Sequence, residues 1–394
     1  MIKDKITTLA NTIFTDVVGY RRHIHANPEL SFKEFETSAY IKEKLTSWGI
    51  PFTDCANTGV VGIIKGNKPS DKVIALRADM DALPILESND KEYKSKNEGV
   101  MHACGHDVHS SSLLGTARIL NELKADFGGT IKLIFQPGEE LLPGGASIMI
   151  KEGVLENPKP QAIIGQHVMP FIEAGKVGFR SGVYMASTDE LYVTVTGKGG
   201  HGAQPQQNID PVVIASHIII ALQQIVSRIA DPRLPSVLSF GKVIANGATN
   251  IIPNEVKIEG TFRTLDEDWR AEAHKRMKKM AEGMAESMGG HCDFEIRKGY
   301  PFLINEEKLS NSARQYAEEF LGADKVEDLD IWMAAEDFAY FSQAADACFY
   351  RLGTGNKAKN TTNSVHTSNF DIDEDALKIS TGLMAYIAVK QLGN

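Results

Sequence analysis

The chain has 394 residues, a length that predicts two or three domains and at least one large core. Hydrophobic residues make up 42% and charged residues 24%, the balance of an ordinary globular protein, which excludes disordered, collagen-like and disulfide-stapled chains. Lys and Arg total 42 against 51 Asp and Glu, and the resulting formal charge of -9 argues against nucleic acid as a partner.

The first 182 residues alternate helical and strand patterns. Residues 1–50 carry apolar side chains at helical spacing, and a further helix is predicted at Ser111–Leu123. Strands are predicted at Val60–Ile64, Val73–Leu76, Ile131–Phe135 and Ala162–Ile164. This alternation predicts an α/β domain with a largely parallel central sheet, whose ligands bind on loops at the strand ends.

The pattern changes at about residue 183. The predicted elements are a strand at Leu191–Thr196, a helix at Pro211–Arg228, strands at Val237–Val243 and Val256–Phe262, a helix at Asp266–Met288 and a strand at Cys292–Arg297. This is the element order of a ferredoxin-like (α+β) domain. We therefore predict a second domain, residues 183–298, inserted in the first.

After the insertion the α/β pattern resumes. A helix is predicted at Glu307–Phe320, a strand at Ala347–Leu352 and a closing helix at Glu374–Gln391. The first domain is therefore expected to be discontinuous and to comprise residues 1–182 and 299–394.

The sequence also bears on the cellular compartment. Apolar runs such as Pro211–Ile220 fall short of the about 20 residues that a membrane span needs. The first residues lack the apolar stretch of a signal peptide. The four cysteines lie far apart and form no CxxC pair, which favours a reducing compartment. We predict a cytoplasmic protein with no membrane partner.

Three short segments concentrate side chains that bind metals, each at or just after a predicted strand: 101–109 (MHACGHDVH), 136–140 (QPGEE) and 165–167 (GQH). Cys104 and His106 are two residues apart, a spacing suited to an extended loop that brings a thiolate and an imidazole to one centre. In an extended segment the adjacent glutamates of QPGEE point in different directions, so one carboxylate can bind a metal while the other transfers protons.

Taken singly, each of these residues has an ordinary structural interpretation. A lone Cys is usually a small buried side chain, a lone His a hydrogen-bonded core residue, and a Glu pair part of a solvated surface. Together they favour a functional site, because QPGEE follows an apolar strand and lacks helical periodicity. Nucleophilic catalysis by Cys104 with His106 is an alternative, but it leaves the two carboxylates without a role.

Seven separated motifs carry a family resemblance. They are Arg77–Pro84 (RADMDALP), Met101–His106 with Asp107 and His109, Phe135–Glu140, Gly199–Pro205 (GGHGAQP), Asn250–Pro253 (NIIP), Ala335–Phe341 (AEDFAYF), and His366 with Phe370. From about His23 onward the chain resembles the M20 metallopeptidases. It is most similar to the amidohydrolase subgroup that contains aminoacylases, hippurate hydrolases, indole-acetyl amino acid hydrolases and N-acetyl-diaminopimelate deacetylases. The resemblance implies a zinc-peptidase-like catalytic domain with an inserted ferredoxin-like lid and dimerisation domain.

The resemblance also implies a centre of two divalent metal ions per subunit. The implied ligands are Cys104, in the bridging place that an aspartate holds elsewhere in M20, with His106, Glu140, His167 and His366. Glu139 falls on the general base that acts on a metal-bound water, and Asp81 on an aspartate that supports a ligand. Asp79 stands where the wider superfamily has a ligand histidine, so a peptidase-type ligand set is not transferable. Thiolate, imidazole and carboxylate donors together suit Zn, Mn, Co or Ni and not Mg or Ca.

Three residues of the insertion complete the implied site. By resemblance, His201 reaches the active site of the other subunit in a dimer and hydrogen-bonds the developing oxyanion. Asn250 and Arg263 resemble the family's groups for a substrate carboxylate.

The sequence therefore predicts a metal-dependent amidohydrolase, a homodimer or a tetramer, that cuts N-acyl amino acids into a carboxylic acid and a free amino acid. Two alternatives stay open. One is a dipeptidase or carboxypeptidase of the same fold, and the other is a member that binds a small ligand without turnover.

Overall fold

The computed structural model describes residues 1–393, which form two compact units. The first unit comprises Met1–Tyr184, Ile304–Asp330 and the chain from Asp337 onward. The second comprises Met185–Leu303 and the short segment Ile331–Glu336. The chain thus leaves the first unit after Asp330 and returns to it at Asp337.

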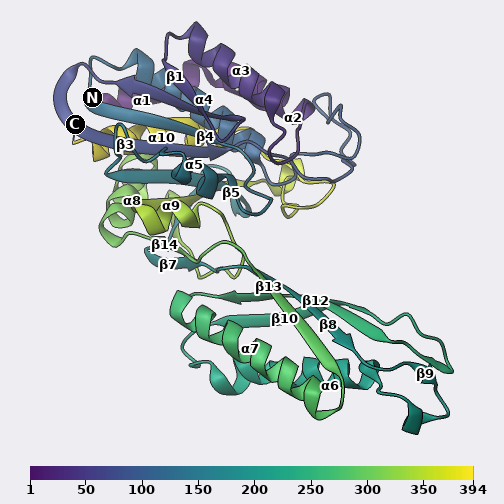
Figure 1. Ribbon diagram of the computed structural model, residues 1–394. Coiled ribbons are helices and arrows are strands. Elements are labelled where there is room, and N and C mark those ends of the chain that lie inside the picture. The colour runs from purple at the N-terminus through teal and green to yellow at the C-terminus, as the bar shows by residue number, and fades with distance from the viewer. Residues whose placement is uncertain (394) are drawn as a thin grey trace. The chain divides into compact units, whose positions relative to one another are not determined.

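The first unit is built on a sheet with strand order β1-β2-β4-β3-β5-β16-β6-β15 (Figure 1). The strands are β1 (Phe52–Cys55), β2 (Gly59–Lys65), β3 (Lys68–Asp79), β4 (Gly128–Gln136), β5 (Ala162–Glu173), β6 (Val177–Phe179), β15 (Val326–Asp328) and β16 (Asp346–Gly355). The central strands β4, β3, β5 and β16 run parallel, whereas β1 and β2 pair antiparallel at one side. The α/β prediction is confirmed, with a mixed sheet around a parallel centre.

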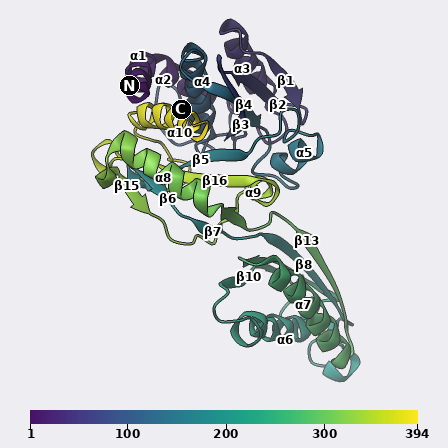
Figure 2. The ribbon, with the colours of Figure 1, turned by 90° about the vertical axis from the view of Figure 1, so that its left-hand side faces the viewer.

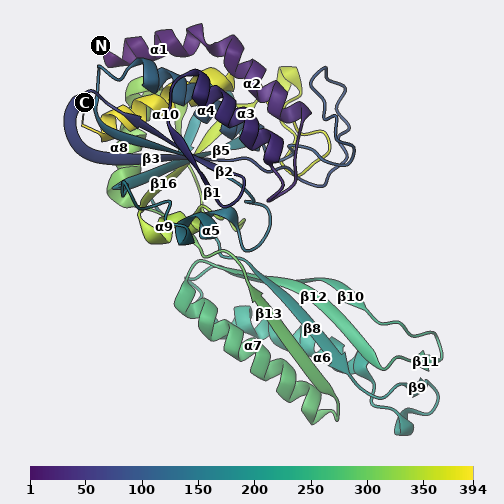
Figure 3. The same ribbon diagram turned by 45° about the horizontal axis from the view of Figure 1, so that its top comes forward.

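Helices cover both faces of this sheet. They are α1 (Ile2–Thr12), α2 (Phe14–Ala26), α3 (Phe35–Ser47), α4 (His106–Glu122), α5 (Gly145–Lys151), α8 (Glu307–Leu321), α9 (Ala339–Ala344) and α10 (Ala376–Gln391). In Figure 3, α1, α2, α4 and α10 lie over one face, and α5 and α9 lie under the other. Sequence reasoning missed the short elements α5 and α9.

Strand periodicity assigns the side chains of β3 to these two faces. Ile74, Leu76 and Ala78 belong to the large core shared with α4 and α10. Because successive side chains point to opposite faces, Arg77 points to the other side, where it contacts Asp337 just before α9. Asp79, the last residue of β3, contacts both Arg77 and His109 of α4, so polar side chains from both sides meet at the end of this strand.

The second unit has the ferredoxin-like element order. Its elements are β8 (Asp189–Thr196), α6 (Pro211–Gln224), β10 (Ser236–Ile244), β12 (Glu255–Thr264), α7 (Glu267–Ser287) and β13 (His291–Lys298). The four strands form an antiparallel sheet in the order β10-β12-β8-β13, and both helices lie on one side of it (Figure 2). Each of these elements overlaps the one predicted from the sequence.

Two small ribbons accompany the large sheets. Strands β9 (Gly200–His201) and β11 (Ile251–Ile252) pair antiparallel in the second unit, and β7 (Gly182–Met185) pairs with β14 (Leu303–Asn305). These strands were not predicted because two to four residues carry too little periodicity.

Helix α6 is longer than the apolar run noted in the sequence, because it continues into a π-turn at Ile225–Ile229. The combined helix Pro211–Ile229 has 19 residues, and 33% of its most apolar 18-residue window is buried. By length and composition it is one helix that could cross a membrane, which is weak support for membrane insertion. Its inner face, with Ile214, Ile218 and Leu222, packs in the core of the second unit.

Candidate metal centre

The candidate ligands of the first unit come from separate parts of the chain. Cys104 lies in the loop before α4, His106 is the first residue of α4, and His167 lies within β5. Glu140 follows β4, and His366 lies in the loop before α10. We expected an extended loop through His106, and this detail is wrong because the helix already begins there.

Gly105 makes this early helix start sterically possible. It has a φ of +81°, in the left-handed region that favours glycine, and its carbonyl accepts hydrogen bonds from the N–H groups of Val108 and His109. A Cβ at this position would lie 2.6 Å from a methyl carbon of Val168. The loop can therefore turn sharply between Cys104 and His106 and bring both side chains to the same place.

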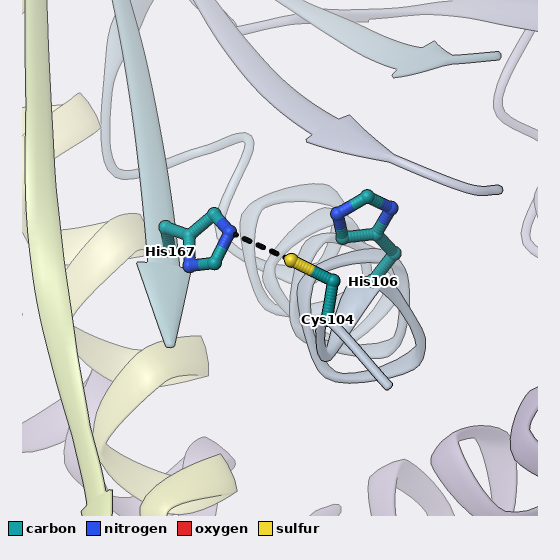
Figure 4. Close-up of side chains that lie close together, drawn as sticks. All are labelled: Cys104, His106 and His167. Carbon is teal, nitrogen blue, oxygen red and sulfur yellow. Dashed lines mark hydrogen bonds between the residues drawn. The ribbon is translucent and has the colours of Figure 1, made fainter. Parts of the chain in front are cut away.

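The donor atoms cluster around Cys104. In Figure 4 its sulfur faces His167, and the Sγ atom lies 3.4 Å from His167 Nε2 and 3.3 Å from His366 Nε2. His366 Nε2 in turn lies 3.1 Å from Glu140 Oε1. Two triads result, Cys104–His106–His167 and Cys104–Glu140–His366, and within each all donor atoms lie within 4.8 Å of one another. Cys104 belongs to both.

Hydrogen bonds orient the histidines toward this cluster. His106 Nδ1 donates to Asp81 Oδ1 at 3.2 Å, and His167 Nδ1 donates to the carbonyl oxygen of Val168 at 2.8 Å. Each ring therefore presents the lone pair of Nε2 to the centre of the site, as metal-binding histidines do.

One donor atom at the centre is orphaned. Among the residues described, His106 Nε2 is buried and has no hydrogen-bond partner, whereas the buried Glu140 Oε1 lies 3.1 Å from His366 Nε2. An unsatisfied buried polar atom costs free energy, so this arrangement suggests a ligand that is not part of the polypeptide. The thiolate, imidazole and carboxylate donors present here fit divalent cations, which these residues would hold.

Burial adjusts the protonation of the donors. It lowers the pKa of His167 well below its usual range, with a smaller contribution from the charge of Arg351, so the neutral imidazole that binds metals is favoured. Burial raises the pKa of Cys104, so the thiol must lose its proton when a cation binds.

The adjacent glutamates contact different partners. The side chain of Glu140 lies next to His366, with Oε1 3.1 Å from His366 Nε2, and the backbone N–H of Glu140 donates to Asp81 Oδ2 at 2.9 Å. Glu139 Oε2 lies 4.0 Å from His106 Nε2, and Glu139 Oε1 accepts a hydrogen bond from the backbone N–H of Asp337 at 3.3 Å. Glu139 thus belongs to neither triad that contains Cys104, but one of its carboxylate oxygens lies within 4.8 Å of donor atoms of both His106 and Glu140.

Asp79 and His109 form a connection that sequence reasoning missed. His109 Nδ1 donates to Asp79 Oδ1 at 2.6 Å, and His109 Nε2 accepts the backbone N–H of Val168 at 2.9 Å. Both side chains are fully buried. Asp79 therefore acts through His109 on the strand that carries His167. The motif RADMDALP pointed to this aspartate but not to its partner.

A second missed residue, Glu34, holds the QPGEE turn. Its Oε1 accepts the backbone N–H groups of Gly138 and Phe32, each at 2.8 Å, and its Oε2 accepts the hydroxyl of Thr58 at 2.7 Å. Gly138 has a φ of +59°, and a Cβ there would lie 2.3 Å from the ring of Phe32. The turn before the two glutamates therefore requires glycine and is fixed by a buried carboxylate.

Glu34 gives a testable dependence of stability on pH. Burial raises the pKa of Glu34 from 4.5 to about 7. Between these values the folded state binds more protons than the unfolded state, so the free energy of unfolding falls as the pH rises. Glu34→Gln keeps an acceptor for the two N–H groups without a charge. We expect its stability relative to wild type to increase by about 1–3 kcal/mol between about pH 5 and 8.

Urea unfolding of the metal-free proteins at both pH values measures this difference. A difference between variant and wild type that is equal at the two values would contradict a buried titrating Glu34.

The three candidate residues of the second unit lie on its strands or beside them. His201 is exposed on β9 and pairs with Ile251, the residue after Asn250. Its Nδ1 accepts the backbone N–H of Ala203 at 3.0 Å, which leaves the donor proton on Nε2. Arg263, on β12, is partly buried and donates to Thr261 Oγ1 at 3.2 Å. The roles of these three residues in the site stay predictions.

Known proteins are similar to this chain over most of its length. The family described as peptidase family M20/M25/M40 matches residues 75–390. An N-acyl-L-amino acid amidohydrolase of Geobacillus stearothermophilus is 43% identical, over 78% of this chain and 83% of that protein. Thermostable carboxypeptidase 2 of Saccharolobus solfataricus is 39% identical over 95% of each chain. The solved structure of the Bacillus subtilis YXEP protein, a dinuclear metal binding peptidase from the M20 family, has a TM-score of 0.83 at 34% identity and covers 97% of this chain and 99% of its own.

Proposed function

The chain belongs to peptidase family M20/M25/M40, and we propose on that basis that it is a metal-dependent amidohydrolase of N-acyl amino acids. The products are a carboxylic acid and a free amino acid. The observation that carries the proposal is the pair of donor triads that share Cys104, with the carboxylate of Glu139 beside them. The 43% identical relative named as an N-acyl-L-amino acid amidohydrolase supports the substrate class.

The ligand roles in this proposal follow the two triads. Cys104, His106 and His167 would hold one divalent cation, and Cys104, Glu140 and His366 would hold the other. The donor set supports Zn, Mn, Co or Ni. When bound, such cations acidify water and polarise a carbonyl group. Asp81 supports the centre by holding both His106 Nδ1 and the backbone N–H of Glu140.

Glu139 is the general base in this proposal. It accepts a proton from the water that attacks the amide carbon, and a carbon–oxygen bond forms. It then donates that proton to the leaving nitrogen as the carbon–nitrogen bond breaks, so that the free amino acid leaves as a neutral amine. Its burial, with 6% of the residue exposed, keeps competing water away from the carboxylate.

The second unit supplies the remaining groups. His201, whose Nε2 carries the donor proton, stabilises the oxyanion, and Asn250 and Arg263 bind the substrate carboxylate. A planar guanidinium suits this recognition because it forms two parallel hydrogen bonds with a carboxylate.

The same unit supports a homodimer. Strand β10 is an edge strand of its sheet, and its side chains Val237 and Val243 are exposed. Val213 and Ile220 are exposed apolar side chains two turns apart on α6. Edge strands and exposed apolar side chains are natural sites for pairing with a second copy. In such a dimer His201 of one subunit serves the site of the other.

This proposal predicts complementation between two inactive variants. His201→Ala and Glu139→Gln each disable the enzyme as a homodimer. If His201 acts on the partner's site, a mixed dimer has one site with an intact base and an intact histidine. Mixing under subunit exchange should then restore about half the activity of a wild-type dimer for each mixed dimer formed. Absence of recovery despite proven exchange would refute action between subunits.

The cysteines support a cytoplasmic location. All four are buried free thiols, as expected in a reducing compartment.

A substrate panel tests the proposed function. N-acetyl, N-benzoyl, N-succinyl and indole-acetyl amino acids and a set of dipeptides are assayed with Mn, Zn, Co or Ni. We expect kcat/KM for at least one N-acyl amino acid to exceed that for every dipeptide. A preference for dipeptides would favour a dipeptidase or a carboxypeptidase, and the Saccharolobus solfataricus relative is named as a carboxypeptidase. Binding without turnover would favour a non-catalytic member.

A further inference from the structure

A buried cluster of polar side chains lies behind the candidate general base. We propose that Asp337 is a positioning residue: its backbone N–H and the clamp around its carboxylate hold Glu139 in the orientation that proton transfer requires. This inference rests on the proposed role of Glu139 as the base. It assigns a role to the AEDFAYF motif, which the metal ligands do not use.

The contact between the two residues is direct. The backbone N–H of Asp337 donates to Glu139 Oε1 at 3.3 Å, which leaves Glu139 Oε2 as the oxygen on the side of His106. One carboxylate oxygen is thus anchored while the other lies near the metal-binding atoms. A free glutamate side chain samples several rotamers, so an anchor on one oxygen increases the fraction of time that the other spends in place.

The carboxylate of Asp337 is clamped from three sides. Its Oδ1 accepts hydrogen bonds from Arg77 Nη2 and Gln136 Nε2, each at 2.8 Å. Its Oδ2 accepts from Gln136 Nε2 at 2.8 Å and from the backbone N–H of Ala146 at 2.9 Å. Asp337, Arg77 and Gln136 are all fully buried. Hydrogen bonds to a buried charge are strong and well defined in direction, so Asp337 has little freedom to move.

The clamp is attached to the parallel strands. Arg77 lies near the end of β3 and also donates to Asp79 Oδ2 at 2.6 Å and to Gln136 Oε1 at 2.8 Å. Gln136 is the last residue of β4, three residues before Glu139. The same strand ends therefore hold the QPGEE segment on one side and Asp337 on the other, which fixes the distance between Asp337 N–H and Glu139.

Asp337 needs such a clamp because of its place in the chain. It is the first residue of the first unit after Ile331–Glu336, and α9 begins only at Ala339. No helix or strand that directly precedes Asp337 sets the direction of its N–H. The hydrogen bonds of its side chain therefore fix the position of its backbone, as regular backbone hydrogen bonds do within helices and strands.

Asp337→Asn tests the inference. The variant keeps the shape and the backbone N–H, but its side-chain NH₂ group faces the donors of Gln136 and Ala146, so the clamp opens on one side. We expect kcat to fall on the order of 10–100-fold, as for a small misplacement of a catalytic group. KM should stay within about twofold and both metals should stay bound, because no ligand is touched.

The decisive measurement is the double variant with Glu139→Gln. If Asp337 acts only through Glu139, replacing Asp337 causes no further loss of kcat once the base is absent. The double variant then has the residual kcat of Glu139→Gln alone. If Asp337 merely holds the fold, the two losses multiply. Multiplying losses, or an unchanged kcat in Asp337→Asn, would overturn the inference. An active Glu139→Gln would instead overturn the proposed base, so the two failures are distinguishable.

Two further variants keep the test informative if Asp337→Asn fails to fold. Gln136→Met removes two of the hydrogen bonds to Asp337 with little change in side-chain length. It should lower kcat as Asp337→Asn does, and it should cause no further loss of kcat in combination with Glu139→Gln.

Lys132→Met is the matched control. Lys132 is buried on the same strand β4, but it donates to the carbonyl oxygens of Val154 and Glu156 at 2.7 and 2.6 Å. Lys132→Met should lower the melting temperature and leave kcat unchanged. If Lys132→Met lowered kcat as much as Gln136→Met does, the inference would also be overturned.

Discussion

Replacing Glu139 with Gln should lower kcat by about 10²–10⁴-fold while the protein keeps its fold and both metal ions. The amide is the same size as the carboxylate but cannot accept the proton of the attacking water. Metal binding should persist because Glu139 lies beside the two triads that share Cys104, with its Oε2 4.0 Å from His106 Nε2. Steady-state kinetics and metal content per chain measure the two effects separately.

The adjacent residue provides the control. Glu140→Gln changes the same chemical group one residue away, on a side chain that lies 3.1 Å from His366 Nε2. It should lower the metal content as well as the activity, because the second triad loses its carboxylate. Wild-type kcat in Glu139→Gln, or equal loss of metal in both variants, would contradict the assignment of base and ligand.

Replacing Cys104 with Ala should abolish measurable turnover and reduce the metal content below two ions per chain. Cys104 is the donor that both triads share, so its loss weakens both sites at once. The effect should exceed the about 10–100-fold that loss of an outer hydrogen-bond partner of a metal ligand costs. Metal analysis and a kinetic assay at saturating metal check this result.

A buried cysteine elsewhere in the same unit is the matched control. Cys348 on β16 is fully buried and lies in the core, and Cys348→Ala should lower stability without changing the metal content. The rival interpretation makes Cys104 a nucleophile with His106 as its base. Full metal content in Cys104→Ala, or an acyl group that accumulates on Cys104 during turnover, would favour that rival.

The long elements were predictable because their pattern is local. Helix α7 and strand β8 show their periods in the sequence itself, and the ferredoxin-like order followed from such elements. The early start of α4 at His106 was missed because it depends on the positive φ of Gly105. A pattern of apolar residues does not reveal such a backbone conformation. Short elements such as α5 were missed for lack of a full period.

The clustering of the site residues was only partly predictable. The segments around Cys104, Glu140 and His167 drew attention through their donor types, and their places at or just after predicted strands suggested a site on loops at the strand ends. The supporting contacts of Arg77 with Asp337 and of Glu34 with Gly138 join positions 260 and 104 residues apart. Such pairs have no local signature, and a resemblance of motifs shows that the residues matter without showing which ones meet.

The most direct test of the metal-dependent amidohydrolase is a titration of the metal-free protein. Chelator-treated protein is supplied with increasing amounts of Zn or Mn, and release of free amino acid from an N-acetyl amino acid is recorded. If two cations share Cys104 beside Glu139, activity is absent without metal and increases until two equivalents per chain are bound. Hydrolysis by the fully metal-free protein, or full activity with no metal bound at Cys104, would contradict the account.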